Sequence, residues 1–244
     1  NSFFAGARVY VSVPGEAREG FTFQPEPAPG LKGSFLGIWE PKFVPDSGGH
    51  STLDVGQADI VPNNVGDFFD YSTGLPYNPI SPVFGGTFTL TTQTGIQYEI
   101  DGETRDARRL TDRNGNSLTF TRSGIHSSSG VGISFERDSR DRIRAVVDPA
   151  GNRIEYDYDR NGDLVAVTDR EGNTTTFLYD EPTRAHYLTE VIDPLGRTGV
   201  RSEYDDQGRL IKTVDANGNA IELVHNADNF TETVVDQRGN STVY

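Results

Sequence analysis

The chain has 244 residues, which is long enough for one large or two small domains with a real hydrophobic core. Its 36 acidic and 22 basic side chains give a formal net charge of −14, and such a surface repels phosphate backbones, which argues against a nucleic-acid partner. The sequence has no cysteine, which excludes a disulfide framework and a thiol nucleophile, and no apolar run of about 18 residues that would span a membrane as a helix.

The composition predicts an all-β protein. Only 34% of the residues are hydrophobic, and many of these are Val, Ile, Phe and Tyr, which suit a half-buried pleated surface. The 27 Gly and 13 Pro residues recur between short alternating segments, and no long window shows helical periodicity. The chain starts at Asn1 without a methionine or a signal peptide, so we expect it to be a processed or excised piece.

Residues 1–60 do not repeat and are predicted to form a small β-module. ARVYVSV (7–13) alternates between apolar and polar residues as a strand does, and GFTFQ (20–24) is its expected hairpin partner. Residues 61–86 are rich in Pro, Asn and Gly and are predicted to form an ordered connector. A regular sheet built from repeats is expected over residues 87–244.

The repeats are marked by a short turn motif, Asp-x-x-Gly followed by Asn or Arg. Its copies are DRNGN, DPAGN, DREGN, DPLGR, DANGN and DQRGN, which start at residues 112, 148, 169, 193, 215 and 236. The last five start 21, 24, 22 and 21 residues apart, whereas the first gap of 36 contains the Ser- and Gly-rich insert 123–132. Such a period predicts one structural unit stacked repeatedly on its neighbours.

A second mark, usually Tyr-Asp, lies between these motifs. It stands at Tyr158-Asp159, Tyr179-Asp180 and Tyr204-Asp205, and His225-Asn226 fills the same position further on. The tract EPTRAHYL (181–188) lengthens the second of these units by three residues. Each unit therefore consists of a strand, a turn, a second strand and a second turn.

Side-chain alternation predicts the strands of each unit. In NRIEYDY (152–158), Ile154, Tyr156 and Tyr158 point to one face and the residues between them to the other. The expected return strands are IRAVV (143–147), LVAVT (164–168) and LIKTV (210–214).

The turns require a residue with positive φ, which glycine adopts without a steric penalty. Gly162 and Gly208 fill this position in two units, and Asn229 fills it in a third. Asparagine is the non-glycine residue that best tolerates this conformation, so positive φ is predicted at Asn229.

These residues resemble the YD-repeat, or Rhs-repeat, family, whose units have the form Y-D-x-x-G-R-L … V-x-D-x-x-G-N. YDDQGRLIKTVDANGN (204–219) matches that form almost letter for letter, and YDRNGDLVAVTDREGN (158–173) nearly so. The resemblance covers about residues 95–244. Rhs toxins, the B and C components of insecticidal toxin complexes and teneurins belong to this family. The resemblance implies an antiparallel strip of β-hairpins that forms part of a spiralling β-shell.

The resemblance implies a scaffold, an enclosure or a cell-surface recognition element rather than catalysis by the repeats. Rhs toxins carry an autoproteolytic core with a D-P-x-G-L segment after the repeats. DPLGR (193–197) departs from that segment at its last residue and lies among ordinary repeats, so no protease function is expected. Because Tyr244 stands two residues before the next expected Tyr-Asp position, we expect the parent polypeptide to continue.

The turn at the first Tyr-Asp pair also has the spacing of a calcium loop. Asp157, Asp159 and Asn161 would supply its first three ligands, but Thr168 stands where a bidentate carboxylate is required. A hairpin turn with Asn161-Gly162 at its corner explains the same residues. We therefore predict no specific metal site and no cofactor, and leave open weak calcium binding at these three residues.

The histidines do not suggest a catalytic site. His225 fills a Tyr position and is expected to be packed, whereas His50, His126 and His186 are scattered without the spacing of a metal centre. His126 adjoins three serines, but there is no nucleophile elbow G-x-S-x-G. No catalytic residue is predicted, and the protein is expected not to be an enzyme.

Trp39, Phe35 and Phe43 allow two interpretations. They could form a stacking platform for sugar rings, or they could be buried in the N-terminal module, which is the more common fate of such residues.

The sequence therefore predicts a structural segment of a large secreted or cell-surface protein, with adhesion through carbohydrate or a partner cell surface as the alternative. The expected partners are the rest of the parent polypeptide and, in the alternative, glycans or another cell surface, without insertion into a membrane.

Overall fold

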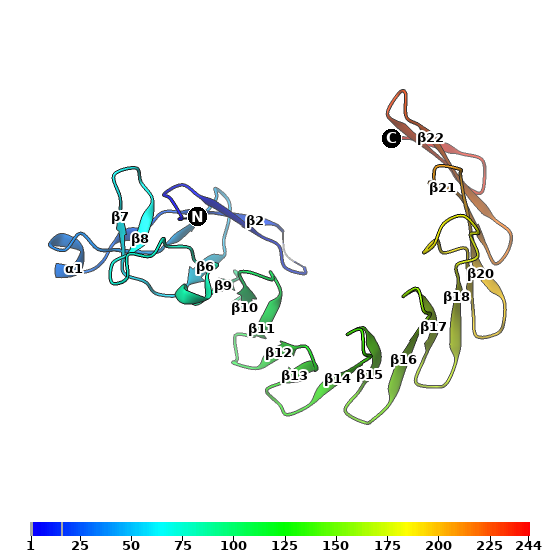
Figure 1. Cartoon of the computed structure of the whole chain (residues 1–244), viewed down its shortest axis with the longest axis horizontal. Helices are drawn as coiled ribbons and strands as arrows, with labels where there is room; N and C mark the ends of the chain where they lie inside the picture. Colours follow the sequence, from blue (N-terminus) through cyan, green and yellow to red (C-terminus); the bar gives the residue numbers. More distant parts are fainter. Residues whose placement is uncertain (1, 16) are drawn as a thin grey trace. The chain divides into compact units, whose positions relative to one another are not determined.

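The computed structural model describes residues 2–15 and 17–244, and almost all of its regular structure is β (Figure 1). The predicted all-β fold class is thus confirmed. The chain divides into two compact units, residues 1–132 and 133–244. The limits at residues 60 and 86 that the composition suggests stay a prediction. No helix in the described part of the chain is both long and apolar enough to cross a membrane.

The first unit contains thirteen strands and two short helical turns among its described residues. They are β1 (Arg8–Val11), β2 (Glu19–Phe23), β3 (Glu26–Pro27), α1 (Leu31–Ser34), β4 (Trp39–Glu40), β5 (Phe43–Pro45), β6 (Thr52–Val55), β7 (Ile60–Pro62), β8 (Phe68–Asp70), the 3₁₀ turn η1 (Pro82–Phe84), β9 (Thr87–Thr91), β10 (Gln97–Asp101), β11 (Ala107–Thr111), β12 (Ser117–Thr121) and β13 (Gly124–Ser127).

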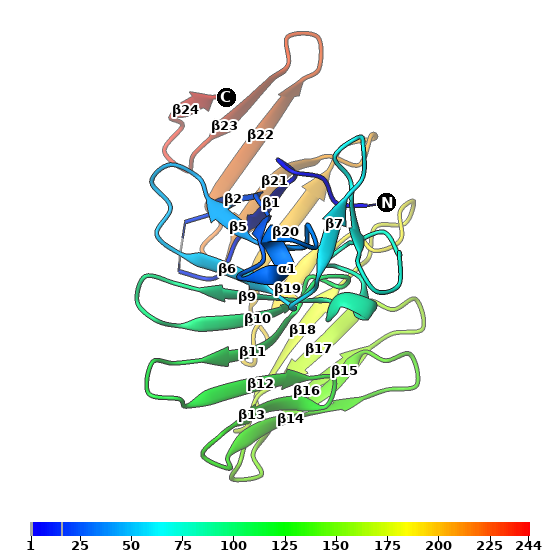
Figure 2. The ribbon, with the colours of Figure 1, turned by 90° about the vertical axis from the view of Figure 1, so that its left-hand side faces the viewer.

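These strands form two small sheets and the start of a regular ladder. Strand β1 pairs antiparallel with β2, which confirms the predicted N-terminal hairpin, and β2 pairs in turn with β5. Strands β3, β4, β7 and β8 form the second small sheet. In the ladder, β6 pairs with β9, and β10 to β13 follow side by side in chain order (Figure 2).

An aromatic core holds the first unit together. Phe23 is fully buried and contacts Phe43, Phe68 and Tyr77 with ring centroids 5.3 to 5.9 Å apart. Aromatic pairs at these distances stabilise a fold beyond the area that they bury. Residues far apart in the chain therefore meet in one core. Its buried members are Phe21, Phe23, Phe43, Leu53, Ile60, Phe68, Tyr77, Phe84, Phe88, Leu90 and Tyr98.

The second unit is an uninterrupted antiparallel meander in which each strand pairs with the next. Figure 1 shows these hairpins following one another from green to red. The strands are β14 (Gly132–Arg137), β15 (Ile143–Val147), β16 (Arg153–Tyr158), β17 (Leu164–Thr168), β18 (Thr174–Leu178), β19 (Glu190–Ile192), β20 (Thr198–Tyr204), β21 (Leu210–Asp215), β22 (Ala220–Asn226), β23 (Thr231–Val235) and β24 (Ser241–Val243).

The predicted strands of the repeats are confirmed. Strands β15, β17 and β21 coincide with the expected return strands to within one residue, and β16 covers the predicted NRIEYDY segment except for Asn152. Tyr156 lies opposite Val167, and Val146 lies opposite Ile154, so apolar side chains share one face of the sheet.

The second unit has little enclosed core. Ala145 is the one hydrophobic side chain that is fully buried among the described residues 133–244, and most of the apolar face is only half buried. The opposite face carries cross-strand ion pairs, such as Arg153 with Glu136 at 2.7 Å and Arg201 with Glu190 at 3.1 Å. Such exposed pairs contribute little each. We therefore attribute much of the stability of this unit to hydrogen bonds within the turns and between neighbouring hairpins.

Candidate functional site

The most regular chemistry in the chain is an aspartate that caps a hairpin turn. In a typical copy, Asp215 Oδ1 accepts hydrogen bonds from the backbone N–H groups of Asn217 and Asn219, both at 2.8 Å. Asp215 Oδ2 accepts from the side-chain amide of Asn219 at 2.8 Å. The backbone N–H of Gly218 donates to the Asp215 carbonyl, and Gly218 has a φ of 83°. The side chain thus completes a turn of five residues.

This arrangement recurs along the chain with small changes. Where the fifth residue is arginine, its Nε replaces the amide, as Arg209 does on Asp205 at 2.8 Å. Asn63 makes the same turn in the N-terminal region by accepting from Val65 and Asp67, which the sequence analysis missed. Within the described residues, nine aspartates cap such turns: Asp112, Asp138, Asp148, Asp159, Asp169, Asp193, Asp205, Asp215 and Asp236.

The caps shift the acidity of these carboxyl groups in one direction. The side-chain hydrogen bond from the residue four positions on is the main cause that lowers the pKa of Asp215 and Asp193. For Asp205 the backbone N–H of Arg209 is the largest cause and, against desolvation, the pKa falls to about 2. A general acid needs a carboxyl pKa raised toward neutrality, and the pKa shifts of these aspartates run in the opposite direction.

The tyrosine of each Tyr-Asp pair reaches back to the preceding hairpin. The Tyr158 hydroxyl donates to the Ile143 carbonyl at 2.9 Å, and the Tyr204 hydroxyl donates to the Leu188 carbonyl at 2.8 Å. Tyr179 makes the same bond with the Leu164 carbonyl at 3.1 Å. We call this contact the tyrosine strut. It ties each hairpin to the one before it.

His225 replaces a tyrosine in this position, as predicted. Its Nε2 lies 2.7 Å from the Leu210 carbonyl, and its Nδ1 lies 2.7 Å from a carboxylate oxygen of Glu232. The predicted packed role of His225 is therefore confirmed, and the histidine acts as a strut of different chemistry.

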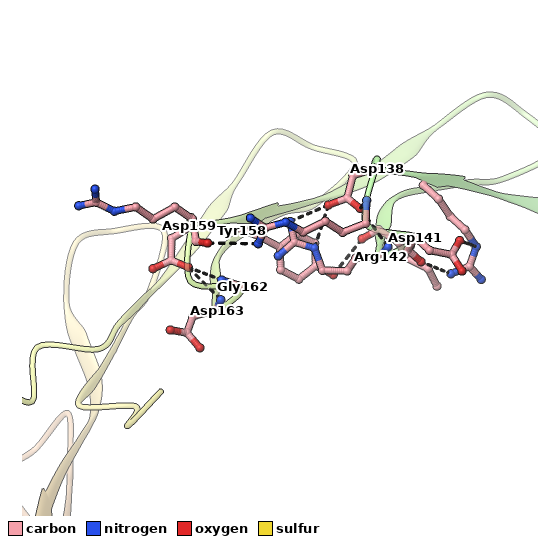
Figure 3. A network of polar contacts seen from close by, with 11 residues as sticks. Asp138, Asp141, Arg142, Tyr158, Asp159, Gly162 and Asp163 are labelled. Carbon is pink, nitrogen blue, oxygen red and sulfur yellow. Dashed lines mark hydrogen bonds and ion pairs between the residues drawn. The ribbon is translucent and has the colours of Figure 1, made fainter. Parts of the chain in front are cut away.

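The unit that begins at Asp138 was not predicted from the sequence, because two of its characteristic residues are replaced. Arg137 stands in the Tyr position before Asp138, and Asp141 takes the glycine position with a φ of 68°. Arg142 binds Asp138 through Nε at 2.8 Å and lies over the Tyr158 ring at 4.1 Å (Figure 3). The 21-residue distance from Asp138 to Asp159 is the signal that would have found it.

The comparisons with known proteins agree with this geometry. The sequence model of the Teneurin YD-shell family matches residues 89–242, which is more than half of the chain. The chain belongs to the Teneurin YD-shell family. This confirms the resemblance to YD repeats, and the family is a structural one of extracellular and cell-surface type. A search of the curated proteins finds no match.

In this YD shell segment the suspected calcium loop is a capped turn. Asp159 Oδ1 accepts from the backbone N–H groups of Gly162 and Asp163 at 2.8 and 2.9 Å, and Asn161 donates to Asp159 Oδ2 at 3.3 Å. Asp157 lies in β16, where it pairs with Ala166. The described residues hold no group of three His, Cys, Asp or Glu side chains placed to bind a metal ion. The hairpin interpretation thus accounts for the motif, and the absence of a metal site stays a prediction.

One detail of the YD turns was predicted wrongly. The residue with positive φ in the turn after His225 is Phe230, at 53°, and not Asn229. Asn226 pairs directly with Thr231, so this loop is built without the register shift found at the turns after Tyr158 and Tyr204. Asn229 instead donates its backbone N–H to the Asn226 side chain at 3.1 Å.

The inserted tract 181–188 lies over two neighbouring YD turns of the second unit. His186 Nδ1 lies 2.7 Å from Asp163 Oδ1, and Arg184 donates to the backbone carbonyl of Asp206. The Tyr187 ring packs edge-on against the Tyr204 ring, with centroids 4.8 Å apart. The tract therefore acts as a strap.

The strap compensates for an unusual residue. Asp163 occupies the position where Arg142 and Arg209 bind their capping aspartates, and its side chain is only 10% exposed. Two carboxylates in one turn repel each other, and a hydrogen-bond donor beside one of them offsets part of that repulsion. His186 supplies a donor that the turn itself lacks.

The serines beside His126 are also structural. Ser128 Oγ accepts from the backbone N–H of Ser117 at 2.9 Å, and Ser127 and Ser129 share a hydrogen bond at 2.8 Å. These contacts hold the β12–β13 hairpin and its following turn.

The aromatic residues of the N-terminal region do not form one exposed platform. Phe43 is buried in the core, whereas Phe35 is 83% exposed. Trp39 is half buried, with its ring centroid 6.4 Å from that of Phe68. Burial thus holds for Phe43 and partly for Trp39. Phe35 lies on the surface one helical turn from Leu31, which is 79% exposed.

Proposed function

We propose that this chain is a wall segment of an extracellular YD shell and that it has a structural role without catalysis. The observation that supports this is the use of the repeated side chains. In the typical copies, the capping aspartate binds the backbone and a side chain of its own turn, and the tyrosine hydroxyl binds the backbone of the preceding hairpin. The repeats therefore offer scaffold and curvature rather than reactive groups.

The shell role includes enclosure of another part of the parent polypeptide. We test it with the full-length parent protein, secreted from its native host and treated with added protease. Segments outside the shell should be cut first, while enclosed segments survive. The double variant Asp205→Ala and Asp215→Ala opens two turns and should make the surviving segments cleavable. Retention of the protein inside the cell, or equal cleavage of wild type and variant, would contradict the proposal.

A second candidate is adhesion, in which the N-terminal region binds a carbohydrate or a partner cell surface. The exposed pair Phe35 and Leu31 favours it, because large apolar side chains gathered on a surface mark interaction sites. Binding to a glycan array and to cells should then fall strongly in Phe35→Ala. If a sugar ring stacks on Trp39, the substitution Trp39→Ala should also reduce binding to the glycan array. No binding by the wild type, or binding that neither substitution changes, would leave only the structural role.

A further inference from the structure

His225 differs from the tyrosine struts in the number of its polar partners. A tyrosine strut has one hydroxyl donor and one carbonyl acceptor, as Tyr204 and Leu188 have at 2.8 Å. His225 faces two acceptors, the Leu210 carbonyl at Nε2 and the Glu232 carboxylate at Nδ1, both at 2.7 Å. Neither acceptor has a proton to donate to the ring.

Two acceptors require two N–H donors. A neutral imidazole has one N–H group and one lone pair, so it can serve one of these acceptors and must turn its lone pair toward the other. An imidazolium ion carries both N–H groups and serves both. The geometry therefore fits the protonated ring alone.

The bonds connect three successive strands. Leu210 begins β21, His225 lies near the end of β22, and Glu232 lies in β23. The backbone of Glu232 pairs in turn with Tyr244, through hydrogen bonds at 2.9 and 3.1 Å. A proton on His225 thus ties the hairpin β22–β23 to β21 on one side and supports the pairing of Tyr244 on the other.

The charges around the ring favour the proton on balance. Glu232 on β23 attracts it directly, and Arg209, in the turn before β21, opposes it. Asp205 binds Arg209 at 2.7 Å and offsets part of that opposition. The hydrogen bond to the Leu210 carbonyl, followed by the one to Glu232, raises the pKa of His225 above its ordinary value of 6.5.

We propose that His225 is a proton-dependent latch, which holds the β22–β23 hairpin against β21 when the imidazole is protonated and releases one of its two bonds when it is neutral. A phenol in general titrates near pH ~10, far above the range in which an imidazole changes its charge. Among the struts, loosening with rising pH is therefore expected at His225 and not at the tyrosines. The latch goes beyond the proposed shell role and does not depend on whether the shell is extracellular.

The sign of the pH effect follows from the raised pKa. A group whose pKa is higher in the folded state contributes stability that is fully present below its unfolded value, here 6.5. That stability is lost as the pH rises through the higher folded value. The hairpin should therefore be tightest in mild acid and loosest above neutrality.

The test measures the latch and the hairpin separately on the whole chain. Nuclear magnetic resonance follows the His225 ring through a pH titration. Hydrogen exchange with mass spectrometry follows residues 220–244 at about pH 5.5 and about pH 8.5, corrected for the intrinsic exchange rate. We expect the ring to titrate above 6.5 and the protection of 220–244 to fall several-fold over that range.

Three variants make the result specific. His225→Tyr restores the common strut and should keep its protection at both pH values. Glu232→Gln keeps an acceptor but removes the charge, and should move the His225 titration to lower pH. His126→Gln removes an exposed imidazole from the first unit and should leave the wild-type response unchanged.

A His225 ring that titrates at or below 6.5 in the wild type would overturn the latch. An equal loss of protection in His225→Tyr and wild type would overturn it as well. Should His225→Tyr fail to fold, the wild-type titration and its shift in Glu232→Gln still decide the question. None of these outcomes bears on enclosure, which the protease experiment on the parent protein tests independently.

Discussion

The aspartate that begins each turn uses its two carboxylate oxygens for different partners. In the turn from Asp215, Oδ1 takes two backbone N–H groups and Oδ2 takes a side-chain donor. An asparagine can reproduce the first contact, as Asn63 does, but it carries no charge. The aspartate thus stabilises the turn both by hydrogen bonding and by its negative charge. Because only the charge depends on pH, a pH titration distinguishes the two contributions.

We expect acid to open the turns. Asp205 has its pKa lowered to about 2 from an ordinary value of 3.8. A lowered pKa contributes stability that is present above the unfolded value and is lost as the pH falls through the folded value. The urea midpoint of the second unit should therefore drop as the pH falls from 3.8 toward 2. In Asp205→Asn, whose amide caps without titrating, that drop should be smaller, and an unchanged drop would contradict this origin.

The tyrosine strut gives a matched comparison within one strand. Tyr158 and Tyr156 lie on the same face of β16. Of these two hydroxyl groups, only that of Tyr158 has a hydrogen-bond partner among the described residues. Tyr158→Phe should lower the free energy of unfolding of this unit by about 1 kcal/mol, the typical net value of one hydrogen bond. Tyr156→Phe should change it little. Equal losses, measured by urea unfolding, would mean that the strut contributes nothing of its own.

At the scale of elements, the turns and the strap determine how neighbouring hairpins meet. A turn binds its own strands, a strut binds the preceding hairpin, and the strap 181–188 reaches two turns at once. The strap also needs room. A Cβ on Gly208 would lie 2.4 Å from the Tyr187 hydroxyl, whereas a Cβ on Gly218 would meet nothing within 4 Å.

These two glycines allow the strap to be tested. Both have a φ of 83°, so Gly208→Ala and Gly218→Ala carry the same backbone strain, about 1 to 2 kcal/mol. Only Gly208→Ala should also displace Tyr187. Limited trypsin digestion should then cut after Arg184 faster in Gly208→Ala than in Gly218→Ala. Equal rates would show that the strap does not depend on this contact.

The elements also show what the sequence could and could not predict. Alternation and the Asp-x-x-Gly-Asn motif predicted β15, β16, β17 and β21, because the side chains themselves build those strands and turns. The unit at Asp138 was missed because its capping geometry survives without a tyrosine or a glycine. Positive φ at Phe230 occurs in a loop without a register shift, and the residue types of that loop indicate neither feature.

At the scale of the whole molecule, the two units are stabilised in different ways. Residues 1–132 enclose an aromatic core, whereas residues 133–244 form a single layer whose apolar face is half buried. That core could not be predicted, because Phe23, Phe68 and Tyr77 share no spacing and meet only through the fold. The Tyr-Asp positions, by contrast, could be predicted from the local sequence alone.

Phenylalanine substitutions should distinguish the two kinds of stability. Phe23→Ala empties part of an enclosed core and should cost about 3–5 kcal/mol. Phe177→Ala removes a half-buried ring from a single layer and should cost clearly less. Hydrogen exchange resolved by segment, measured at one pH, gives the opening free energy of each unit. A larger loss from Phe177→Ala would mean that the second unit has a core of its own.

The reach of the tyrosine strut has a consequence for how such chains grow over generations. Each strut spans 15 or 16 residues and stops at the hairpin before it, while each cap is closed within five residues. A duplicated stretch of one repeat therefore brings its own turn with it, and at its junction it has to re-form one strut and one strand pairing. Outside the reach of the strap 181–188, gene segments that encode these hairpins can therefore be copied or lost with few changes in the neighbouring hairpins. The length of such a chain can then change during evolution in steps of one whole repeat.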